Sequence, residues 1–288
     1  GNTDTALRQD LLGHGYRVFT SPALAGRGPV VDQDGFGSFG NCPITLPENM
    51  TVNSTGSIDT AGEHLARFFT HLHDSYGVDE IDVVGHSMGG MTAITYAGLY
   101  PHEIGNRIAG VALIATAANG LTDAGYGRLL RNPMVSWFQA AVRISPAAMR
   151  RAKSIGCKVF APIVRSAEFG NRKVSPRILA LAATMHNATP IETMAAFLSS
   201  FMTYDETAAL RQLSAVPTVV LCGSADLMTP QSHSVAMAAE VDYSDLVIVD
   251  GAGHSVILEQ PTEVAAAVGR MIGRIDIATE AASLALVA

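Results

Sequence analysis

The chain has 288 residues, 48% hydrophobic and 16% charged, so it is long and apolar enough for a large core and is not a disordered chain. Its formal net charge of −7 argues against a protein that binds nucleic acid through overall basicity. Its apolar stretches are shorter than the roughly 20 residues that cross a bilayer, so we expect no membrane span.

The predicted elements alternate between helix and strand. In order, the patterns predict a helix over 4–12, a strand over 17–20, a Gly/Pro/Asn-rich loop over 22–56, a helix over 57–76, a strand over 81–84, a helix over 88–100 and a strand over 107–115. The alternation resumes with a strand over 216–222, a helix over 231–240, a strand over 246–249 and a helix over 261–274. It predicts an α/β fold with a mostly parallel sheet that is flanked by helices.

Residues 119–209 interrupt this alternation, since they are rich in Ala, Met and Leu and contain no evident strand. We therefore expect a core domain formed by 1–118 and 210–288 and a helical insertion over 119–209. The insertion carries 11 basic and five acidic residues, a net of +6, whereas the rest carries eight basic and 21 acidic residues, a net of −13. The basic insertion either attracts anionic substrates or lipid surfaces or complements the acidic core domain.

The strongest motif is Gly85-His86-Ser87-Met88-Gly89-Gly90, between a predicted strand and a predicted helix. This context is that of the G-x-S-x-G nucleophile elbow, in which a sharp turn lifts the serine hydroxyl above the sheet. We therefore predict Ser87 as a nucleophile. The Met88 backbone N–H, at the start of the helix, is the predicted oxyanion donor.

A serine nucleophile needs a base, and His254 follows the last predicted strand at its C-terminal end. His86 adjoins Ser87, but neighbours on a tight turn point apart, so we do not expect it to act as the base. The third member is expected to be Asp226, in the turn after the strand 216–222, with Asp250 and Asp205 as less favoured candidates. The order Ser87, Asp226, His254 fits the elbow arrangement.

The chain resembles α/β-hydrolase-fold serine hydrolases of the capped esterase/lipase type. The resemblance is carried by residues 15–28, 78–101, 216–230 and 247–261, with the elbow and Gly251-Ala252-Gly253-His254 as its most specific parts. It implies an α/β-hydrolase fold in which 119–209 form a helical cap, or lid, over the active site.

One part of the resemblance departs from the family pattern. The family normally begins with further strands and a His-Gly loop that donates a second oxyanion N–H, and the comparison with this pattern predicts that these N-terminal strands are missing here. Leu11-Leu12-Gly13-His14-Gly15 superficially resembles that loop, but we favour a helix end at 13–15. The second oxyanion donor is therefore expected to lie N-terminal to Gly1.

The predicted reaction is cleavage of a carboxylic ester through an acyl-enzyme on Ser87, with a small-molecule or lipid ester as substrate and no cofactor or metal. The alternatives are a perhydrolase, a C–C bond hydrolase or an acyltransferase on the same triad, or a non-catalytic binding protein. Four aromatic residues of the insertion are expected either to line an acyl pocket or to pack between cap helices: Trp137, Phe138, Phe197 and Phe201.

The sequence gives only limited indications of the cellular compartment and of the role of the cysteines. Residues 1–20 lack a signal peptide, so a cytoplasmic location is favoured, with secretion as the alternative if a segment before Gly1 has been removed. The three scattered cysteines, Cys42, Cys157 and Cys222, are too few for a disulfide framework or a metal cage.

Overall fold

The computed structural model describes residues 11–13, 15–19, 58–170, 174–176, 178–180, 182 and 191–287. The predictions for 1–10, for the loop over 22–56 with Cys42, and for His14 lie outside these residues. The described strands are β1 (Ile81–His86), β2 (Ile108–Ile114), β3 (Thr218–Gly223) and β4 (Asp245–Val249). Around them lie α2 (Ile58–Tyr76), α3 (Met88–Leu99), η2 (Pro101–Glu103), η3 (Gly125–Arg131), α4 (Pro133–Ile144), α5 (Pro146–Glu168), α7 (Ile191–Thr203), η4 (Thr207–Ala215), α8 (Gln231–Glu240), α9 (Val256–Glu259) and α10 (Pro261–Val287).

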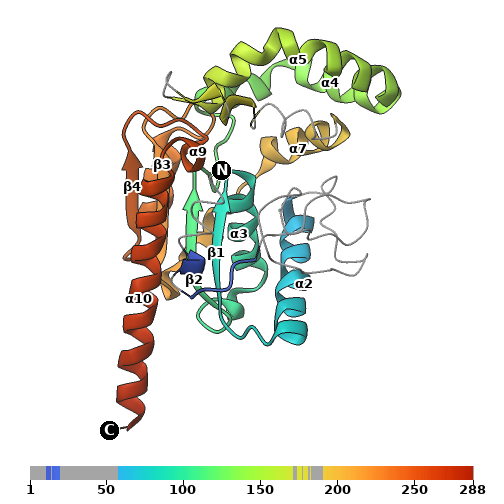
Figure 1. Cartoon of the computed structure of the whole chain (residues 1–288). Coiled ribbons are helices and arrows are strands. Elements are labelled where there is room, and N and C mark those ends of the chain that lie inside the picture. Colours follow the sequence, from blue (N-terminus) through green and yellow to red (C-terminus); the bar gives the residue numbers. More distant parts are fainter. Residues whose placement is uncertain are drawn as a thin grey trace.

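The four strands form one parallel sheet in the order β1-β2-β3-β4, so each strand pairs with the next along the chain (Figure 1). The two central strands are almost wholly buried, whereas β1 and β4 alternate between exposed and partly buried residues. The apolar run of β2 thus reflects a strand covered on both faces. Because all strands run the same way, their C-terminal ends meet at one edge of the sheet.

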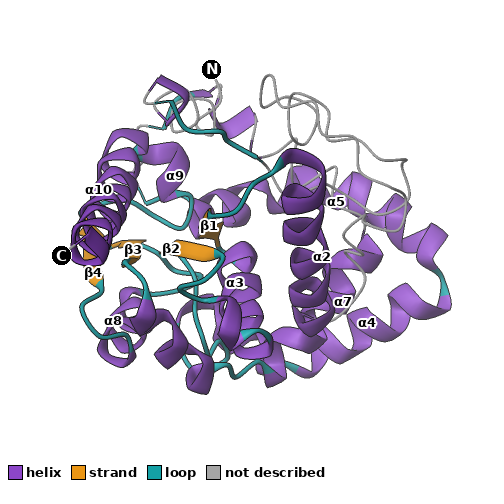
Figure 2. Cartoon of the chain, turned by 90° about the horizontal axis from the view of Figure 1, so that it is seen from below, coloured by secondary structure: helices purple, strands orange, loops and turns teal. Residues whose placement is uncertain are grey.

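Two helical layers cover the sheet, on opposite faces (Figure 2). Val111, Leu113 and Val220 point to the face covered by α2, α3, η4 and α8. Their neighbours Ala112 and Ile114 point to the other face, where α9 and α10 pack. The alternation of side chains along β2 therefore builds two apolar cores, as the α/β prediction requires.

The expected strand over 17–20 is not a strand of the sheet. Residues 16–19 have no regular secondary structure, although Phe19 packs against the core and the Arg17 side chain donates to the Tyr76 carbonyl. A strand is defined by a neighbour's backbone hydrogen bonds, and its own apolar pattern does not supply that neighbour.

The segment before Tyr16 is the end of a helix, as favoured over a His-Gly loop. Residues 11–13 are helical, the Gly15 N–H donates to the Leu12 carbonyl, and the Tyr16 N–H donates to the Leu11 carbonyl. These two bonds and the positive φ of Gly15, 89°, form a Schellman C-cap.

Between β2 and β3 the described chain is helical and contains no strand. Here α4, α5 and α7 pack on one another through a small apolar cluster of Val142, Ile191 and Ala195, with Phe138 and Met149 beside it. Figure 1 places α4 and α5 at the end of the molecule opposite the C-terminus.

The last helix is longer than expected. α10 runs to Val287, beyond the predicted end near Arg274, and the residues predicted to face inward are buried: Val264, Val268, Met271 and Ile272. No helix among the described residues is both long enough and apolar enough to span a membrane.

Candidate active site

Ser87 lies at the sharp turn between β1 and α3. Its backbone has φ 53° and ψ −121°, a left-handed conformation that a residue with a side chain adopts only under local constraint. The Ser87 N–H donates to the Ile114 carbonyl at 2.9 Å, and Thr116 Oγ1 donates to the Ser87 carbonyl at 2.7 Å. These bonds to Ile114, the last residue of β2, and to Thr116, two residues later, hold the elbow.

The glycines of the elbow differ in the space around them. A Cβ on Gly85 would lie 2.7 Å from the Gly89 backbone, and one on Gly90 would lie 2.6 Å from the Thr116 side chain. Gly89 itself has nothing within 4 Å of a Cβ. Close backbone approach therefore requires Gly85 and Gly90 to be glycine, while Gly89 is not needed for packing.

The structure brings Ser87, His254 and Asp226 together at the C-terminal edge of the sheet. His254 Nε2 lies 2.9 Å from Ser87 Oγ, and His254 Nδ1 lies 3.0 Å from Asp226 Oδ2. Asp226 and His254 are each only 3% exposed. A carboxylate only accepts, so Nδ1 carries the proton and the lone pair on Nε2 faces the serine hydroxyl.

Asp226 is fixed by groups of its own turn. Its Oδ1 accepts from the Met228 N–H at 2.8 Å and the Thr229 N–H at 2.9 Å, and its Oδ2 accepts from Thr229 Oγ1 at 2.8 Å. Burial alone would raise the pKa of Asp226, but the His254 and Thr229 hydrogen bonds and the charge of His254 outweigh burial and lower the pKa. Asp226 is therefore held ionised beside His254.

The other two carboxylates considered from the sequence serve local turns. Asp250 is exposed, and its Oδ1 accepts from Ser224 Oγ at 3.2 Å. Asp205 Oδ1 accepts from the N–H and the hydroxyl of Thr207, at 3.1 and 2.7 Å. Neither bonds to His254.

His86 contacts the site, but through the backbone of His254. Its Nε2 donates to the His254 carbonyl at 2.9 Å, and the two rings lie with centroids 5.3 Å apart. Burial, helped by the charge of His254, lowers the pKa of His86 to about 4, so the ring is neutral at pH 7. Sequence reasoning placed His86 away from the serine but had no signal for this bond, which spans 168 residues.

The end of α5 is bonded to the loop that carries His254. The Ser255 N–H and hydroxyl donate to the Glu168 carbonyl and carboxylate, both at 2.8 Å. The Glu259 carboxylate accepts from the Gly253 N–H at 2.7 Å and from the Gly170 N–H at 3.1 Å. Glu259 therefore bridges the histidine loop and the residues just after α5, a contact that sequence reasoning missed.

The four aromatic residues considered for an acyl pocket lie in different surroundings. Phe201 and Met88 pack against a buried apolar cluster that includes Met91 of α3. The Phe201 ring also stacks on that of Phe197, with centroids 6.2 Å apart. Phe138 packs against the apolar cluster formed by Val142, Ile191 and Ala195. Trp137 is 78% exposed, so the structure does not support a buried lining role for it.

Met88 is the first residue of α3, which follows Ser87 directly. The first N–H groups of a helix have no partner within the helix and carry its positive end. The Met88 N–H therefore belongs to the helix end beside the nucleophile, as the oxyanion prediction requires. The second donor, N-terminal to Gly1, stays a prediction.

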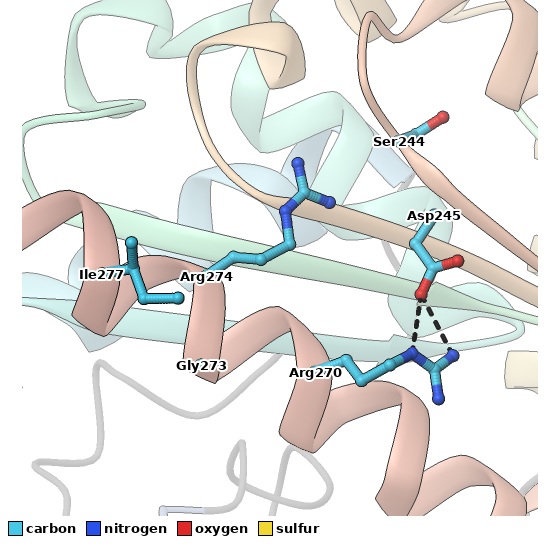
Figure 3. A pocket seen from close by; sticks show the side chains of 6 residues that line it. All are labelled: Ser244, Asp245, Arg270, Gly273, Arg274 and Ile277. Carbon is cyan, nitrogen blue, oxygen red and sulfur yellow. Dashed lines mark hydrogen bonds and ion pairs between the residues drawn. The ribbon is translucent and has the colours of Figure 1, made fainter.

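A separate surface hollow of about 580 Å³ lies between β4 and α10 (Figure 3). Both Arg270 nitrogens that face Asp245 donate to its Oδ2, at 3.0 and 3.1 Å, and the Arg274 guanidinium donates to the Tyr243 carbonyl at 3.0 Å. Both arginines are thus already engaged by the protein.

Among the described residues, no group of three His, Cys, Asp or Glu side chains is placed to hold a metal ion.

Several solved structures share this fold. An esterase from Thermogutta terrifontis is 24% identical, with a TM-score of 0.57 over 76% of this chain and 73% of that one. An enol-lactonase from Burkholderia xenovorans is 21% identical (TM-score 0.57; 76% and 74% covered), and a bromoperoxidase from Bacillus anthracis is 16% identical (TM-score 0.58; 77% and 76% covered). At these identities the likeness shows the fold alone.

No curated protein matches the chain significantly in sequence. The sequence profile described as "Alpha/beta hydrolase family" matches residues 5–267, which include Ser87, Asp226 and His254. With the profile over most of the chain and the fold shared with solved structures of this class, the chain belongs to the alpha/beta hydrolase family.

Proposed function

We propose that the protein hydrolyses carboxylic esters, including cyclic esters, through an acyl-enzyme on Ser87. The observation that carries this proposal is the bonded chain from Ser87 Oγ through His254 to Asp226, with distances of 2.9 and 3.0 Å. The esterases and lactonases among the structures with this fold support the choice of an ester as substrate.

Each proposed step uses the side chains and backbone groups described above. His254 Nε2 takes the Ser87 proton while Oγ attacks the ester carbonyl, and the resulting oxyanion faces the Met88 N–H. Collapse breaks the bond to the alkoxy group, which leaves with the proton from His254. Water, deprotonated by His254, then attacks the acyl-Ser87 ester. The bond between the acyl carbon and Oγ breaks, Ser87 Oγ takes the proton back from His254, and the acid is released.

The test is Ser87-dependent labelling by a fluorophosphonate, followed by turnover of nitrophenyl esters of increasing acyl length. We expect wild type and Ser136→Ala, an exposed serine on α4, to be labelled and active, and Ser87→Ala to lose both properties. Because triad members act as a unit, the loss of turnover should be about 10⁴-fold or more.

Other outcomes separate the alternatives. Ser87-dependent labelling without ester turnover would contradict the ester substrate and favour a perhydrolase, a C–C bond hydrolase or an acyltransferase. If Ser87→Ala is labelled as well as wild type, the enzyme interpretation fails, and a binding protein on this fold is the alternative.

A further inference from the structure

The outer side of α4 exposes three large apolar side chains. Met134, Trp137 and Ile144 are 74%, 78% and 84% exposed. Their separations of three, seven and ten residues place them on one face of the helix. We call these three residues the α4 outer face.

Another side of α4 is packed against α7. Val142 is only 4% exposed and contacts Ile191 and Ala195, while the Gln139 amide donates to the Ala195 carbonyl at 3.0 Å and to Ser199 Oγ at 2.8 Å. These contacts tie the inner side of α4 to α7, and both views place α4 at the periphery of the molecule (Figures 1 and 2). The outer face is therefore the side that the fold leaves to solvent.

The chain before, within and after α4 is basic. Residues 124–153 contain six basic residues and no acidic one. Five of the six are exposed arginines that lie in η3, in α4 and at the start of α5: Arg128, Arg131, Arg143, Arg150 and Arg151. Asp123, the nearest acid before this stretch, is paired with Arg131.

The positive charge near α4 favours an anionic lipid surface, rather than a second copy of the chain, as the partner of the α4 outer face. A two-fold pair of copies joined at this face would bring the same basic surface against itself. An anionic lipid surface attracts arginines by about 1 kcal/mol each and accepts apolar side chains without needing a shaped groove. A tryptophan, with an apolar ring and one N–H donor, suits the region between headgroups and acyl chains.

We propose that the α4 outer face and its flanking arginines dock the protein on anionic lipid surfaces. The apolar side chains enter the boundary below the headgroups, while the arginines contact the headgroup phosphates. This inference does not rest on the proposed reaction, because it concerns binding by side chains outside the triad.

The chain supplies its own probe, because Trp137 is its single tryptophan. The experiment titrates the full chain with vesicles of phosphatidylcholine alone, or of phosphatidylcholine and phosphatidylglycerol in equal parts, and follows tryptophan emission. We expect a blue shift and protection from acrylamide quenching with the anionic vesicles only. High salt should weaken this binding, because salt screens the arginines.

Two double variants, each with a matched control, test the two components. Met134→Ala/Ile144→Ala should weaken vesicle binding about tenfold, and Arg143→Glu/Arg150→Glu should do so by at least about tenfold. The controls are substitutions at similarly exposed residues outside 119–209. Ile277→Ala, at a residue 69% exposed, is the control for the apolar variant, and Arg211→Glu, at a side chain 79% exposed, is the control for the arginine variant. Circular dichroism confirms that each variant is folded.

Several results would overturn the proposal. These are the absence of a blue shift with anionic vesicles, equal shifts with both vesicle types, and equal weakening by the control substitutions. A blue shift that appears without vesicles and grows with protein concentration would assign the face to a second copy instead. Binding to soluble heparin without any tryptophan response to vesicles would assign the arginines to a soluble polyanion.

Discussion

At the scale of single residues, the elbow concentrates strain at one position. A side chain held at φ 53° costs about 1–3 kcal/mol, so the surroundings must over-determine the turn. Three bonds do so here: the Ser87 N–H to the Ile114 carbonyl, the Thr116 hydroxyl to the Ser87 carbonyl, and the Gly90 N–H to the same carbonyl. Because the turn closes on its own backbone, there is no room for a Cβ at Gly85.

A Cβ would clash at Gly85 but not at Gly89, so alanine substitutions at the two positions should differ in effect. Gly85→Ala should lower the free energy of unfolding by about 1–3 kcal/mol, because its methyl group forces the Gly89 backbone away. It should also slow fluorophosphonate labelling about 100-fold through displacement of Ser87. Chemical denaturation and labelling rates check both effects.

Gly89→Ala is the matched control, since nothing lies within 4 Å of its Cβ and the site is helical. Alanine is the better helix former by up to about 1 kcal/mol, so this variant should be as stable as wild type or slightly more stable. Equal destabilisation by the two substitutions would contradict the packing argument.

At the scale of elements, the end of α5 is hydrogen-bonded to the loop that carries His254. The end of α5 reaches the residues on both sides of His254 through Glu168, and Glu259 of α9 bridges Gly253 and Gly170. A carboxylate suits this bridge because both of its oxygens accept, so it satisfies two N–H donors at once. The position of His254 thus depends on the place where α5 ends.

Replacing the bridging carboxylate tests this dependence. Glu259→Gln leaves one accepting oxygen and turns an amide NH₂ toward the other N–H, so one bond is lost. A hydrogen bond to a charged group contributes about 1.5–3 kcal/mol, and we expect kcat/KM for a nitrophenyl ester to fall about tenfold or more. Steady-state kinetics over a range of pH values give the measurement.

Glu263→Gln is the control, since Glu263 is an exposed carboxylate in the first turn of α10. It should leave kcat/KM unchanged. If Glu259→Gln is folded and has the same kcat/KM and pH profile as wild type, Glu259 does not position His254.

At the scale of the whole molecule, buried titratable groups link stability to pH. His86 has a pKa of about 4 in the folded protein, against about 6.5 in the unfolded chain. Between these values the unfolded chain binds more protons at this group, so the contribution of His86 to the free energy of unfolding rises with pH there and levels off above about 6.5. Asp226 acts lower, because its lowered pKa gives stability that is lost as pH falls below its ordinary range near 3.8.

Removal of the His86 titration should flatten this dependence. His86→Gln keeps an amide donor for the His254 carbonyl but does not titrate between pH 4 and 6.5. We expect wild type to lose about 3 kcal/mol of unfolding free energy from pH 7 to pH 4 through this group, and the variant to lose correspondingly less. Denaturant titrations at several pH values measure the difference.

His102→Gln, at a histidine side chain that is 73% exposed, should keep the wild-type pH dependence. The interpretation of His86 as a buried neutral group fails if His86→Gln and wild type show the same slope of stability against pH.

The sequence predicted the core elements well where the pattern is local. The apolar run of β2, the helix α8 from Gln231 to Glu240 and the elbow between β1 and α3 agree with the predicted spans to within one or two residues. The strand expected over 17–20 was wrong, because a strand depends on a neighbour's backbone as well as on its own side chains. The extent of α10 was underestimated, since this helix runs to Val287, beyond the predicted end near Arg274.

In the candidate site, too, features that follow from a local sequence pattern were predicted, and long-range contacts were not. Ser87, Asp226 and His254 were identified because each follows a predicted strand of a parallel sheet, which puts all three at one edge. The bonds from His86 to the His254 carbonyl and from Glu259 to two backbone N–H groups have no local pattern, since their partners include residues 168 and 89 positions away. The sequence by itself determined the fold class, the order of the described elements and the candidate triad, because strand and turn preferences are local. Only the tertiary structure decided how His254 is held and which side of the cap meets solvent, because those depend on which distant surfaces pack together.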